Sequence, residues 1–502
     1  MGYNTRNTFN IVGGGILMNK RLISIFLLIT LSAGVVSCDR GNNVKDTDTP
    51  IGDGAVDAPD AEDIYVDLPN DDYTGMEFTF ANEVEASSWC ILTLDCDEPT
   101  GEVLDNAIYQ RNRSIEEKLG VTIDVQEYSR ASELPAAIRQ NAMSGDDPID
   151  VYDVLTDSSA ALIQEGYFMT VDDIGIDIEK PWWNKTVMDS LTVGGECYSI
   201  AGDLSIMLWE ASYGIVFNKD IAARLGLEDH YDLVRDGKWT LDVMYENMVA
   251  AWESNGDLTV DDDDTFGMCG TNRFMPYMMI AGGENIVSAD ESGFPEFNGL
   301  GERLVDMYSK ILGVYYTFDG VCIEGRTVFK DTSKTFHTVF TSGDSLYYFE
   351  PIGCNVVLRD VKFDYGYLPM PKYDEAQEDY ITPILQYAHT MCVTKSKSAE
   401  EVEMISAVLE NLAAYSHKNI RSVYFDTVLE GKRTRDDGTI EMFDIIFSNQ
   451  VFSPVCVYNW GKLSSVLTNN AMNKKEEIVS SVEAITPAIK ADIEKTVEFY
   501  TQ

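Results

Sequence analysis

The chain has 502 residues, with 84 acidic and 37 basic side chains and a net charge of −47 at pH 7. A charge of this sign repels phosphate backbones and anionic lipid headgroups, so it argues against nucleic acid binding and against broad contact with a membrane surface. The length exceeds what one hydrophobic core usually serves, and 45% hydrophobic residues are enough for two lobes or domains.

The N-terminal region has the pattern of an export signal. Lys20 and Arg21 precede an apolar run over residues 22–36, which is shorter than the roughly 20 residues of a membrane-spanning helix. The run ends in VVSC, which resembles the lipobox of bacterial lipoproteins. We therefore expect a signal peptide over residues 1–37, with Met18 as the natural start, and a lipid on Cys38. The alternative is an ordinary signal followed by an ordinary thiol.

A linker follows the signal. Residues 38–72 are acidic, rich in Gly and Pro and poor in apolar side chains, which predicts disorder because such a segment cannot bury a core. A flexible chain of this length spans roughly 30 Å, which suits a leash between a membrane and a folded body.

Strand and helix patterns then alternate along the first part of the folded region. The expected order is a strand at 76–82, a helix through 103–119 that ends at Gly120, a strand at 121–125, a helix at 133–143 capped by Ser132, a strand at 149–155 and a helix that ends at Gly166. Strands separated by helices favour a parallel, doubly wound α/β sheet.

The same alternation restarts further along the chain. It predicts a strand at 213–218, a helix that ends at Gly226, a helix from 241 capped by Thr240, strands at 363–371 and 388–394, and an amphipathic helix at 398–416. Helix-rich sequence continues to the C-terminus.

Cysteines and histidines give little support for metal or catalytic sites. Eight cysteines follow Cys38 without any CxxC pair, which argues against a zinc site. Disulfides, for example between Cys90 and Cys96, and buried thiols both stay open. The four histidines, His230, His337, His389 and His417, lie far apart in the sequence.

The order of these patterns carries a resemblance to a known family. The lipobox and the leash, followed by IEEKLGVTIDV, DDPIDVYDVL, YSIAGD, YGIVFNKDIAARLGL and RDGKWTLDVM, resemble the extracellular solute-binding proteins of ABC importers, in the family that includes maltose- and oligosaccharide-binding members. The resemblance covers residues 76–502. It implies the type II periplasmic-binding-protein fold, in which two doubly wound α/β lobes are joined by hinge segments and hold solute in the cleft between them.

The resemblance also implies a division of the chain. Residues 73–212 and about 388–425 would form the N-terminal lobe, and residues 213–387 and about 426–502 the C-terminal lobe, with crossings near 211–214 and 384–389. Closure on the solute would let a permease recognise the loaded protein without any bond being made or broken. We therefore expect a monomeric binding protein rather than an enzyme. It would be anchored by Cys38 on the outer face of the bacterial cytoplasmic membrane and would deliver a sugar or oligosaccharide to ABC permease subunits.

Candidate solute contacts follow from the chemistry of sugars, whose apolar C–H faces suit aromatic rings and whose hydroxyls suit carboxylates, amides and Arg. Several candidates fall near the first crossing, and others match by position the stretches where sugar-binding relatives place an aromatic ring. The set is Trp182, Trp183, Asp203, Trp209, Glu210, Tyr213, Asn272, Arg273, Tyr347, Tyr348, Glu350, Tyr458 and Trp460. For each of them, packing in the core or exposure on a solvated face is the alternative.

Other functions stay open at this point. The acidic stretch from Glu253 to Asp264 hints at a calcium loop, but it lacks the EF-hand spacing and a solvated loop is favoured, so we expect no cofactor. A surface-tethered glycoside hydrolase or lyase would act through paired carboxylates. A starch-capturing outer-membrane lipoprotein would have an almost all-helical body.

Overall fold

The computed structural model describes residues 68–501 except 86–89, 93, 97–100, 146, 258, 262, 284–285, 328, 331–332 and 431–436; for 355, 359, 427–430 and 437 it describes the backbone alone. The predicted signal peptide, Cys38 and most of the leash lie outside the described residues. Residues 62–502 form one compact unit.

The first sheet has four strands in the order β12-β3-β1-β2. They are β1 (Glu77–Glu83), β2 (Thr122–Tyr128), β3 (Val151–Leu155) and β12 (His389–Cys392). β1 pairs in parallel with β2 and β3, whereas β12 pairs antiparallel with β3. The predicted parallel pairing is confirmed for β1 with β2 and β3, whereas β12 is antiparallel because this strand returns to the first sheet from a distant part of the chain.

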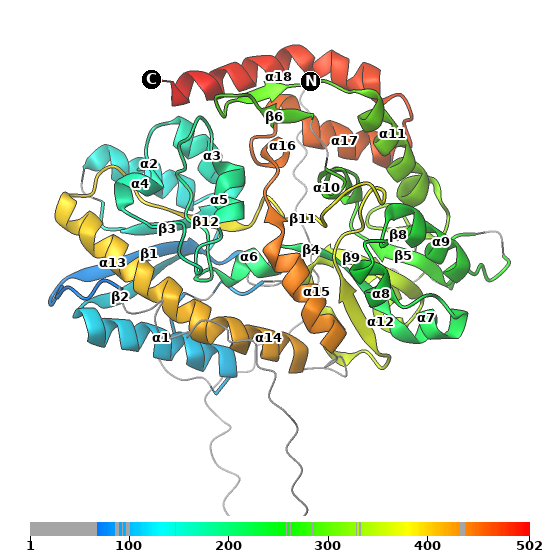
Figure 1. Ribbon diagram of the computed structural model, residues 1–502, viewed down its shortest axis with the longest axis horizontal. Coiled ribbons are helices and arrows are strands. Elements are labelled where there is room, and N and C mark those ends of the chain that lie inside the picture. The colour runs from blue at the N-terminus through cyan, green and yellow to red at the C-terminus, as the bar shows by residue number, and fades with distance from the viewer. Residues whose placement is uncertain are drawn as a thin grey trace, which may run out of the picture. The chain divides into compact units, whose positions relative to one another are not determined.

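Helices cover both faces of the first sheet (Figure 1). They are α1 (Val103–Leu119), α2 (Leu134–Ser144), α3 (Thr156–Gln164), α4 (Val171–Ile174), α5 (Lys185–Leu191) and α13 (Ala399–Tyr415). α1 ends at Gly120 as predicted, since this residue has φ 75° and a Cβ there would lie 2.5 Å from Thr74 Oγ1. The predicted cap Ser132 is wrong, because Glu133 holds the N-cap position of α2 and makes no capping bond.

The second sheet has five strands in the order β10-β4-β9-β5-β8. They are β4 (Tyr213–Asn218), β5 (Phe266–Gly270), β8 (Val321–Ile323), β9 (Ser345–Pro351) and β10 (Tyr365–Leu368). β5 is parallel to β8 and β9, and β4 is antiparallel to β9 and β10. Both main sheets are therefore mixed. Their presence excludes the almost all-helical body that is expected of a starch-capturing lipoprotein.

The helices of the second half agree closely with the sequence pattern. α7 begins after β4 and stops before Gly226, and Thr240 accepts a hydrogen bond from the Val243 N–H at the start of α9. The elements of this half are α6 (Ile206–Glu210), α7 (Lys219–Leu225), α8 (His230–Arg235), α9 (Leu241–Ala251), α10 (Phe274–Ala281), α11 (Glu302–Ile311), the π-helical η3 (Leu312–Thr317), α12 (Phe336–Ser342) and the 3₁₀ helix η4 (Ile352–Asp360).

The C-terminal elements connect the two sheets. They are η5 (Ser416–Ile420), α14 (Arg421–Glu430), α15 (Asp437–Ser448), α16 (Pro454–Val457), η6 (Trp460–Lys462), α17 (Leu463–Met472) and α18 (Ile478–Tyr500), together with two small ladders, β11 (Thr382–Pro383) with β13 (Gln450–Val451) and β6 (Val287–Ala289) with β7 (Pro295–Phe297). α18 packs on α17 and α11, and near its end Tyr500 contacts the ring of Tyr198, which precedes α6. Figure 1 shows this helix running along the top, above both sheets.

Candidate functional site

The carboxyl ends of three strands of the second sheet bring charged residues together. β5 is the middle strand of the three, and its Gly270 pairs with Phe349 of β9 and Ile323 of β8. Arg273 follows β5, so Glu350 at the end of β9 and Glu324 after β8 lie on either side of it. Ligands in open α/β folds bind outside the carboxyl ends of strands, so this edge of the second sheet is a candidate ligand site.

A cavity of about 230 Å³ opens at this edge. It lies between the start of α10, the segment that returns to the first sheet, and the turn that leads into α17. Its lining residues are Asn272, Arg273, Pro276, Tyr277, Gln386, Tyr387, Cys456, Asn459, Ser464, Ser465, Thr468 and Asn469. Most of these side chains carry an amide or a hydroxyl, so the cavity can exchange several neutral hydrogen bonds with a bound molecule.

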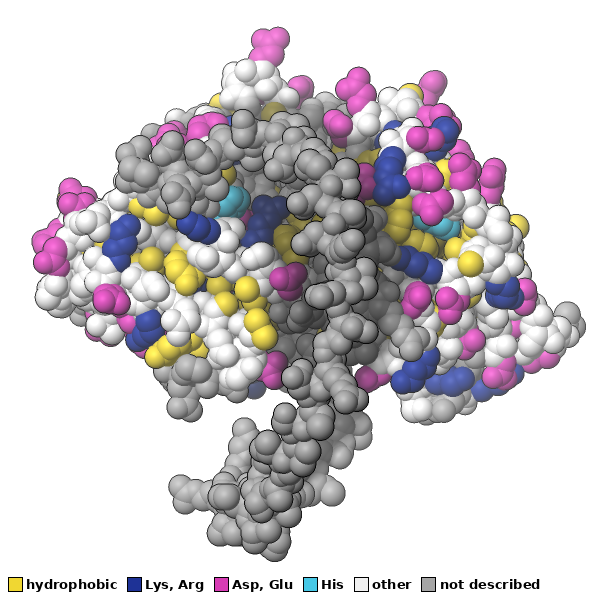
Figure 2. All heavy atoms as spheres, turned by 60° about the horizontal axis from the view of Figure 1, so that its bottom comes forward, with side chains coloured by type: hydrophobic (Ala, Val, Ile, Leu, Met, Phe, Trp, Pro, Cys, Tyr) yellow, Lys and Arg dark blue, Asp and Glu magenta, His cyan; other side chains and the backbone are white. Residues whose placement is uncertain are grey.

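Among the described residues that line the cavity, Arg273 is the one with a charged side chain. Its guanidinium lies 5.2 Å from the ring centroid of Tyr387. In the part of the chain that the structure describes, no carboxylate lies within salt-bridge distance of Arg273 and no acceptor lies within hydrogen-bond distance. On the face that Figure 2 shows, in contrast, acidic side chains are scattered around the surface with Lys and Arg among them.

The cavity floor is built by aromatic packing. The ring of Tyr213, at the start of β4, stacks on Phe349 at 4.8 Å and contacts Tyr277 at 4.1 Å. The Tyr277 hydroxyl donates a hydrogen bond to the side-chain carbonyl of Gln386. These contacts fix the returning segment against the second sheet.

Several carboxyl groups raise the pKa values of two thiols, those of Cys90 and Cys354, in the region between the sheets. Burial raises the pKa of Cys90, and the charges of Glu210, Glu83 and Asp153 raise it further. Burial also raises the pKa of Cys354, assisted by Glu350, Cys90 and Glu210. Groups from the first sheet, from α6 and from the second sheet therefore meet in one region.

Two of these carboxyl groups hold their protons unusually strongly. Burial raises the pKa of Glu350 to about 8, with repulsion from Glu324 adding to the shift and Arg273 opposing it. Burial raises the pKa of Glu210 to about 7, although the N–H of Ile91 donates to this carboxylate. Near neutral pH, Glu350 is mostly uncharged, so the region between the sheets is less acidic than its composition indicates.

His389 forms a buried charged triad beside this region. Its Nδ1 lies 2.9 Å from Asp153 Oδ2 and its Nε2 lies 3.0 Å from Glu83 Oε1. Burial disfavours the imidazolium, but the two acids outweigh burial and raise the pKa of His389 to about 9. Sequence reasoning treated this histidine as isolated, because its partners are more than 200 positions away.

The predicted tryptophan pair lies in the core. Trp182 is 1% exposed and Trp183 is 5% exposed. Both indole N–H groups donate to the carboxylate of Glu410 in α13, at 2.6 and 3.1 Å. The structure does not bring either ring to the cavity.

Four further candidates are tied to neighbours elsewhere. Tyr347 hydrogen-bonds His230, and Tyr348 hydrogen-bonds His337, both from inside the second sheet's core. Trp209 packs on Tyr424 and Phe425. Asp203 pairs with His417 at 2.5 Å.

The last two candidates stack on each other below the turn into α17. The rings of Tyr458 and Trp460 lie parallel at 4.8 Å, and their polar ends reach Tyr500 and Thr496 of α18. Of the thirteen candidates, Asn272 and Arg273 line the cavity, Tyr213 supports it, and Glu210 and Glu350 lie in the region between the sheets.

Sequence reasoning missed most of the polar lining. Gln386 and Tyr387 sit inside a predicted crossing, and this position was a usable signal. No sequence pattern distinguished the other polar lining residues from ordinary surface residues, because small polar side chains are common on any solvated segment. These residues are Asn459, Ser464, Ser465, Thr468 and Asn469.

The acidic stretch after α9 is held by a lysine. Lys330 Nζ lies 3.2, 2.9 and 3.0 Å from carboxylate oxygens of Asp257, Asp261 and Asp263. The described residues contain no group of His, Cys, Asp and Glu suited to a metal ion. All eight cysteines after Cys38 are thiols in the structure, without a disulfide between Cys90 and Cys96.

Within the described residues, none of the helices combines the length and the apolar character that crossing a bilayer requires.

The structural neighbours share the fold at low sequence identity. A cyclo/maltodextrin-binding protein complexed with maltotetraose superposes with a TM-score of 0.55 and 13% identity, covering 84% of this chain and 97% of its own. An ABC substrate-binding protein from Listeria monocytogenes in complex with cycloalternan gives 0.52 and 14%, covering 84% and 99%. UgpB from Mycobacterium tuberculosis in complex with glycerophosphocholine gives 0.52 and 11%, covering 84% and 99%.

These neighbours confirm the predicted fold class of two main α/β sheets in the type II periplasmic-binding-protein arrangement. No curated protein matches the chain by sequence. The family described as "Bacterial extracellular solute-binding protein" matches residues 112–405, more than half of the chain. Its members bind solutes rather than catalyse reactions, in agreement with the predicted non-enzymatic role. The chain therefore belongs to the bacterial extracellular solute-binding proteins.

Proposed function

We propose that this protein captures a carbohydrate outside the cell by closing two lobes around it and delivers it to the permease of an ABC transporter. The observation that carries the proposal is the cavity beside Arg273, whose lining combines amides, hydroxyls and two tyrosine rings. Sugar hydroxyls pair with the former, and the apolar faces of sugar rings pack on the latter. The cavity, at about 230 Å³, is smaller than the roughly 300–1,000 Å³ of typical small-molecule pockets, which favours a solute of no more than one or two sugar rings.

The solved neighbours support this class of solute. Maltotetraose and cycloalternan, the ligands of two of them, are oligosaccharides. Glycerophosphocholine, the ligand of the third, is not a sugar. The fold alone is therefore compatible with different solutes, and the polar lining of the cavity supports a carbohydrate.

The division into lobes is part of the proposal. Residues 73–212 and 388–425 would move as one lobe, and residues 213–387 and 426–502 as the other. The two crossings lie side by side, because the Leu385 N–H donates to the Ala211 carbonyl at 2.9 Å and Ser212 pairs with Ile384. Adjacent crossing segments support a hinge about which solute shifts the lobes to the closed state.

Among the thirteen predicted contacts, we propose three as solute contacts: Asn272, Arg273 and Glu350. Nine of the other ten, Glu210 included, are buried, and Tyr458 stacks on Trp460, which supports packing roles, with Tyr213 holding the cavity floor.

A direct binding measurement tests the proposal. Calorimetry and thermal unfolding of the full chain, with a panel of mono- and oligosaccharides, amino acids and short peptides, should show binding and stabilisation by a sugar, because a ligand raises stability by mass action. Chromatography of the recovered sugar should show it unaltered. Binding of amino acids or peptides in place of sugars contradicts the proposal, and shorter glycan products favour the alternative of a carbohydrate-active enzyme.

We also propose that a lipid on Cys38 holds the protein at the outer face of the cytoplasmic membrane. The support is the VVSC sequence after an apolar run of signal length. In a bacterial host, Cys38→Ser should move the protein from the membrane fraction to the soluble exported fraction. Retention of the variant in the membrane fraction contradicts the anchor.

A further inference from the structure

The charge of the cavity lining differs from that of the whole protein. The chain carries −47, yet the described residues that line the cavity include one arginine and no acid. An arginine can donate to sugar hydroxyls, but a neutral sugar does not require a full positive charge in its site. A neutral carbohydrate therefore does not account for the charge of this residue.

The hydrogen-bonding state of Arg273, which is half-buried, also differs from that of the buried Arg111. Arg111 uses three nitrogens, donating to Asn112, Ser416 and the Leu94 carbonyl. Arg273 has none of its five N–H groups on an acceptor in the described part of the chain. Arg273 is half-buried and its guanidinium lines the cavity, so its N–H groups are open to an acceptor that arrives with a ligand.

The neighbouring carboxyl groups do not take that role. Glu324 accepts a hydrogen bond from the Thr271 hydroxyl at 3.1 Å, and neither Glu324 nor Glu350 reaches salt-bridge distance to Arg273 in the described residues. Burial raises the pKa of Glu350 to about 8, so that this group is mostly neutral near pH 7 and repels an incoming anion little.

We propose that the solute is an acidic sugar, a mono- or short oligosaccharide whose carboxylate is bound by Arg273. A guanidinium binds a carboxylate through two parallel hydrogen bonds, which gives both strength and a fixed orientation. Asn272, Gln386 and Asn469 then pair with ring hydroxyls, and Tyr387 supports the guanidinium from one side. This inference rests on the proposed function and names the class of sugar within it.

Calorimetry on the full chain tests the inference with matched ligands. The probes are galacturonic acid, digalacturonic acid and glucuronic acid, the neutral sugars galactose and glucose, the methyl ester of galacturonic acid, and acetate and succinate as carboxylates without a sugar ring. We expect at least one uronate to bind about a hundredfold more tightly than its neutral counterpart and its ester, because the charge-assisted pair is lost in both. Its affinity should also fall as salt rises.

Variants assign the effect to the cavity. R273Q should lose about a hundredfold in uronate affinity, and R273K should recover part of it, since lysine keeps the charge but not the paired geometry. R303Q removes the same charge from an exposed pair with Asp374 and should leave the affinity unchanged. Thermal unfolding of each variant confirms that it is folded, and the methyl ester tests the same contact in the unaltered protein.

The outcomes separate the two proposals. Equal affinity for neutral and acidic sugars, or uronate binding that R273Q leaves intact, overturns the acidic-sugar inference while carbohydrate binding stands. Binding of acetate or succinate at least as tight as that of every uronate overturns the sugar class. Absence of binding to every sugar overturns the proposed function as well.

Discussion

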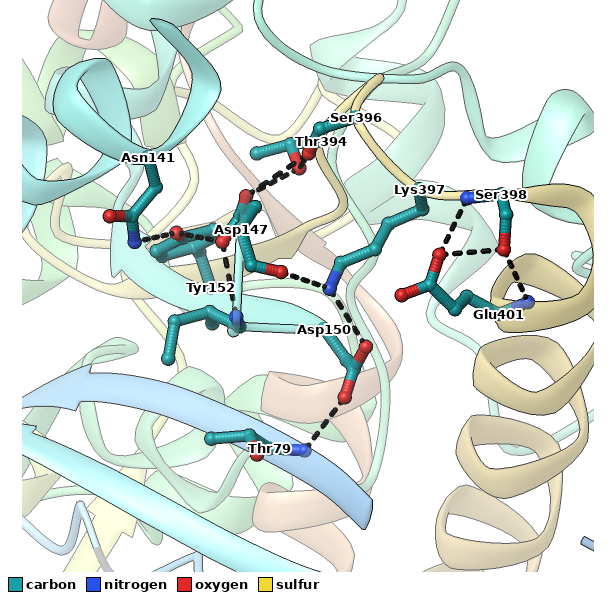
Figure 3. Close-up of polar contacts among 11 residues, drawn as sticks. Thr79, Asn141, Asp147, Asp150, Tyr152, Thr394, Ser396, Lys397, Ser398 and Glu401 are labelled. Atoms are coloured by element: carbon teal, nitrogen blue, oxygen red, sulfur yellow. Dashed lines mark hydrogen bonds and ion pairs between the residues drawn. The ribbon is translucent and has the colours of Figure 1, made fainter. Parts of the chain in front are cut away.

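Two cations at different edges of the sheets, a buried lysine and a half-buried arginine, differ in what surrounds them. Lys397 lies at the amino end of β3, where its Nζ is 3.0 Å from Asp150 Oδ1 and donates to the Asp147 carbonyl at 2.8 Å. The second carboxylate oxygen of Asp150 accepts from the Thr79 N–H of β1, and Ser398 and Glu401 cap α13 next to the lysine (Figure 3). Arg273, at the carboxyl end of β5, has no such partners among the described residues.

The comparison separates a structural charge from a binding charge. A buried cation held by a carboxylate and a carbonyl of the protein has a structural role and offers little to a ligand. A cation whose donors face a cavity is available to a ligand that supplies the acceptor. Substitutions around Lys397 should therefore change the free energy of unfolding, and substitutions around Arg273 should change the affinity for solute.

The largest expected effect comes from removing one member of the buried pair. Asp150→Ala leaves the Lys397 ammonium buried without its counter-charge, so we expect the free energy of unfolding in urea to fall by about 3–5 kcal/mol. The double variant Asp150→Ala with Lys397→Met removes both charges and should regain much of this loss. A double variant no more stable than Asp150→Ala contradicts the assignment of the loss to the uncompensated charge.

The His389 triad predicts a pH dependence of stability. The pKa of His389 is raised to about 9 in the folded protein, against an ordinary value of 6.5. Between these values the folded protein keeps a proton that the unfolded chain has released, so stability is full below pH 6.5 and is lost as the pH rises through 9. The loss attributable to this group is about 3 kcal/mol.

His389→Gln provides the control, because glutamine cannot take up the charge. Unfolding free energies of both proteins should be measured from pH 6 to 10, and their difference isolates the histidine from the thiols that also titrate in this range. A difference that stays constant with pH contradicts a charged His389.

An intermediate effect is expected at Glu410, which accepts from both Trp182 and Trp183. Glu410→Ala leaves two buried indole N–H groups without their acceptor, so we expect a loss of about 1–3 kcal/mol in the free energy of unfolding. Solute affinity should be unchanged in calorimetry, and Glu410→Gln should lose less because it keeps a carbonyl oxygen. A tenfold loss of affinity in a folded Glu410→Ala protein would instead connect the tryptophans with the solute site.

The fold was more predictable than the site for physical reasons. β4 and α7 begin and end where the sequence pattern indicates, because Asn218 and Gly226 fix the helix ends by local chemistry. The sequence pattern predicted the position of β12 in the chain. It did not predict the antiparallel pairing with β3, because that pairing depends on the three-dimensional path of the residues between the two strands. Trp182 and Trp183 have the composition expected of a sugar site, but only their three-dimensional contact with Glu410 shows where their N–H groups point.

The smallest expected effect on stability comes from the cavity itself. Asn469 is exposed on α17 and lines the cavity, so Asn469→Ala should change the free energy of unfolding by no more than about 0.5 kcal/mol. Its amide offers one neutral hydrogen bond to a bound sugar, worth about 0.5–1.5 kcal/mol, and its loss should weaken solute binding about two- to tenfold in calorimetry. Asn473→Ala, at the C-cap of α17, one helical turn after Asn469 and outside the lining, is the matched control and should leave affinity unchanged. Equal solute affinity of the two variants would show that the solute does not contact α17. Weaker binding by Asn469→Ala alone would show that polar groups of the cavity lining bind the ligand, whereas the partners of Lys397 stabilise the fold.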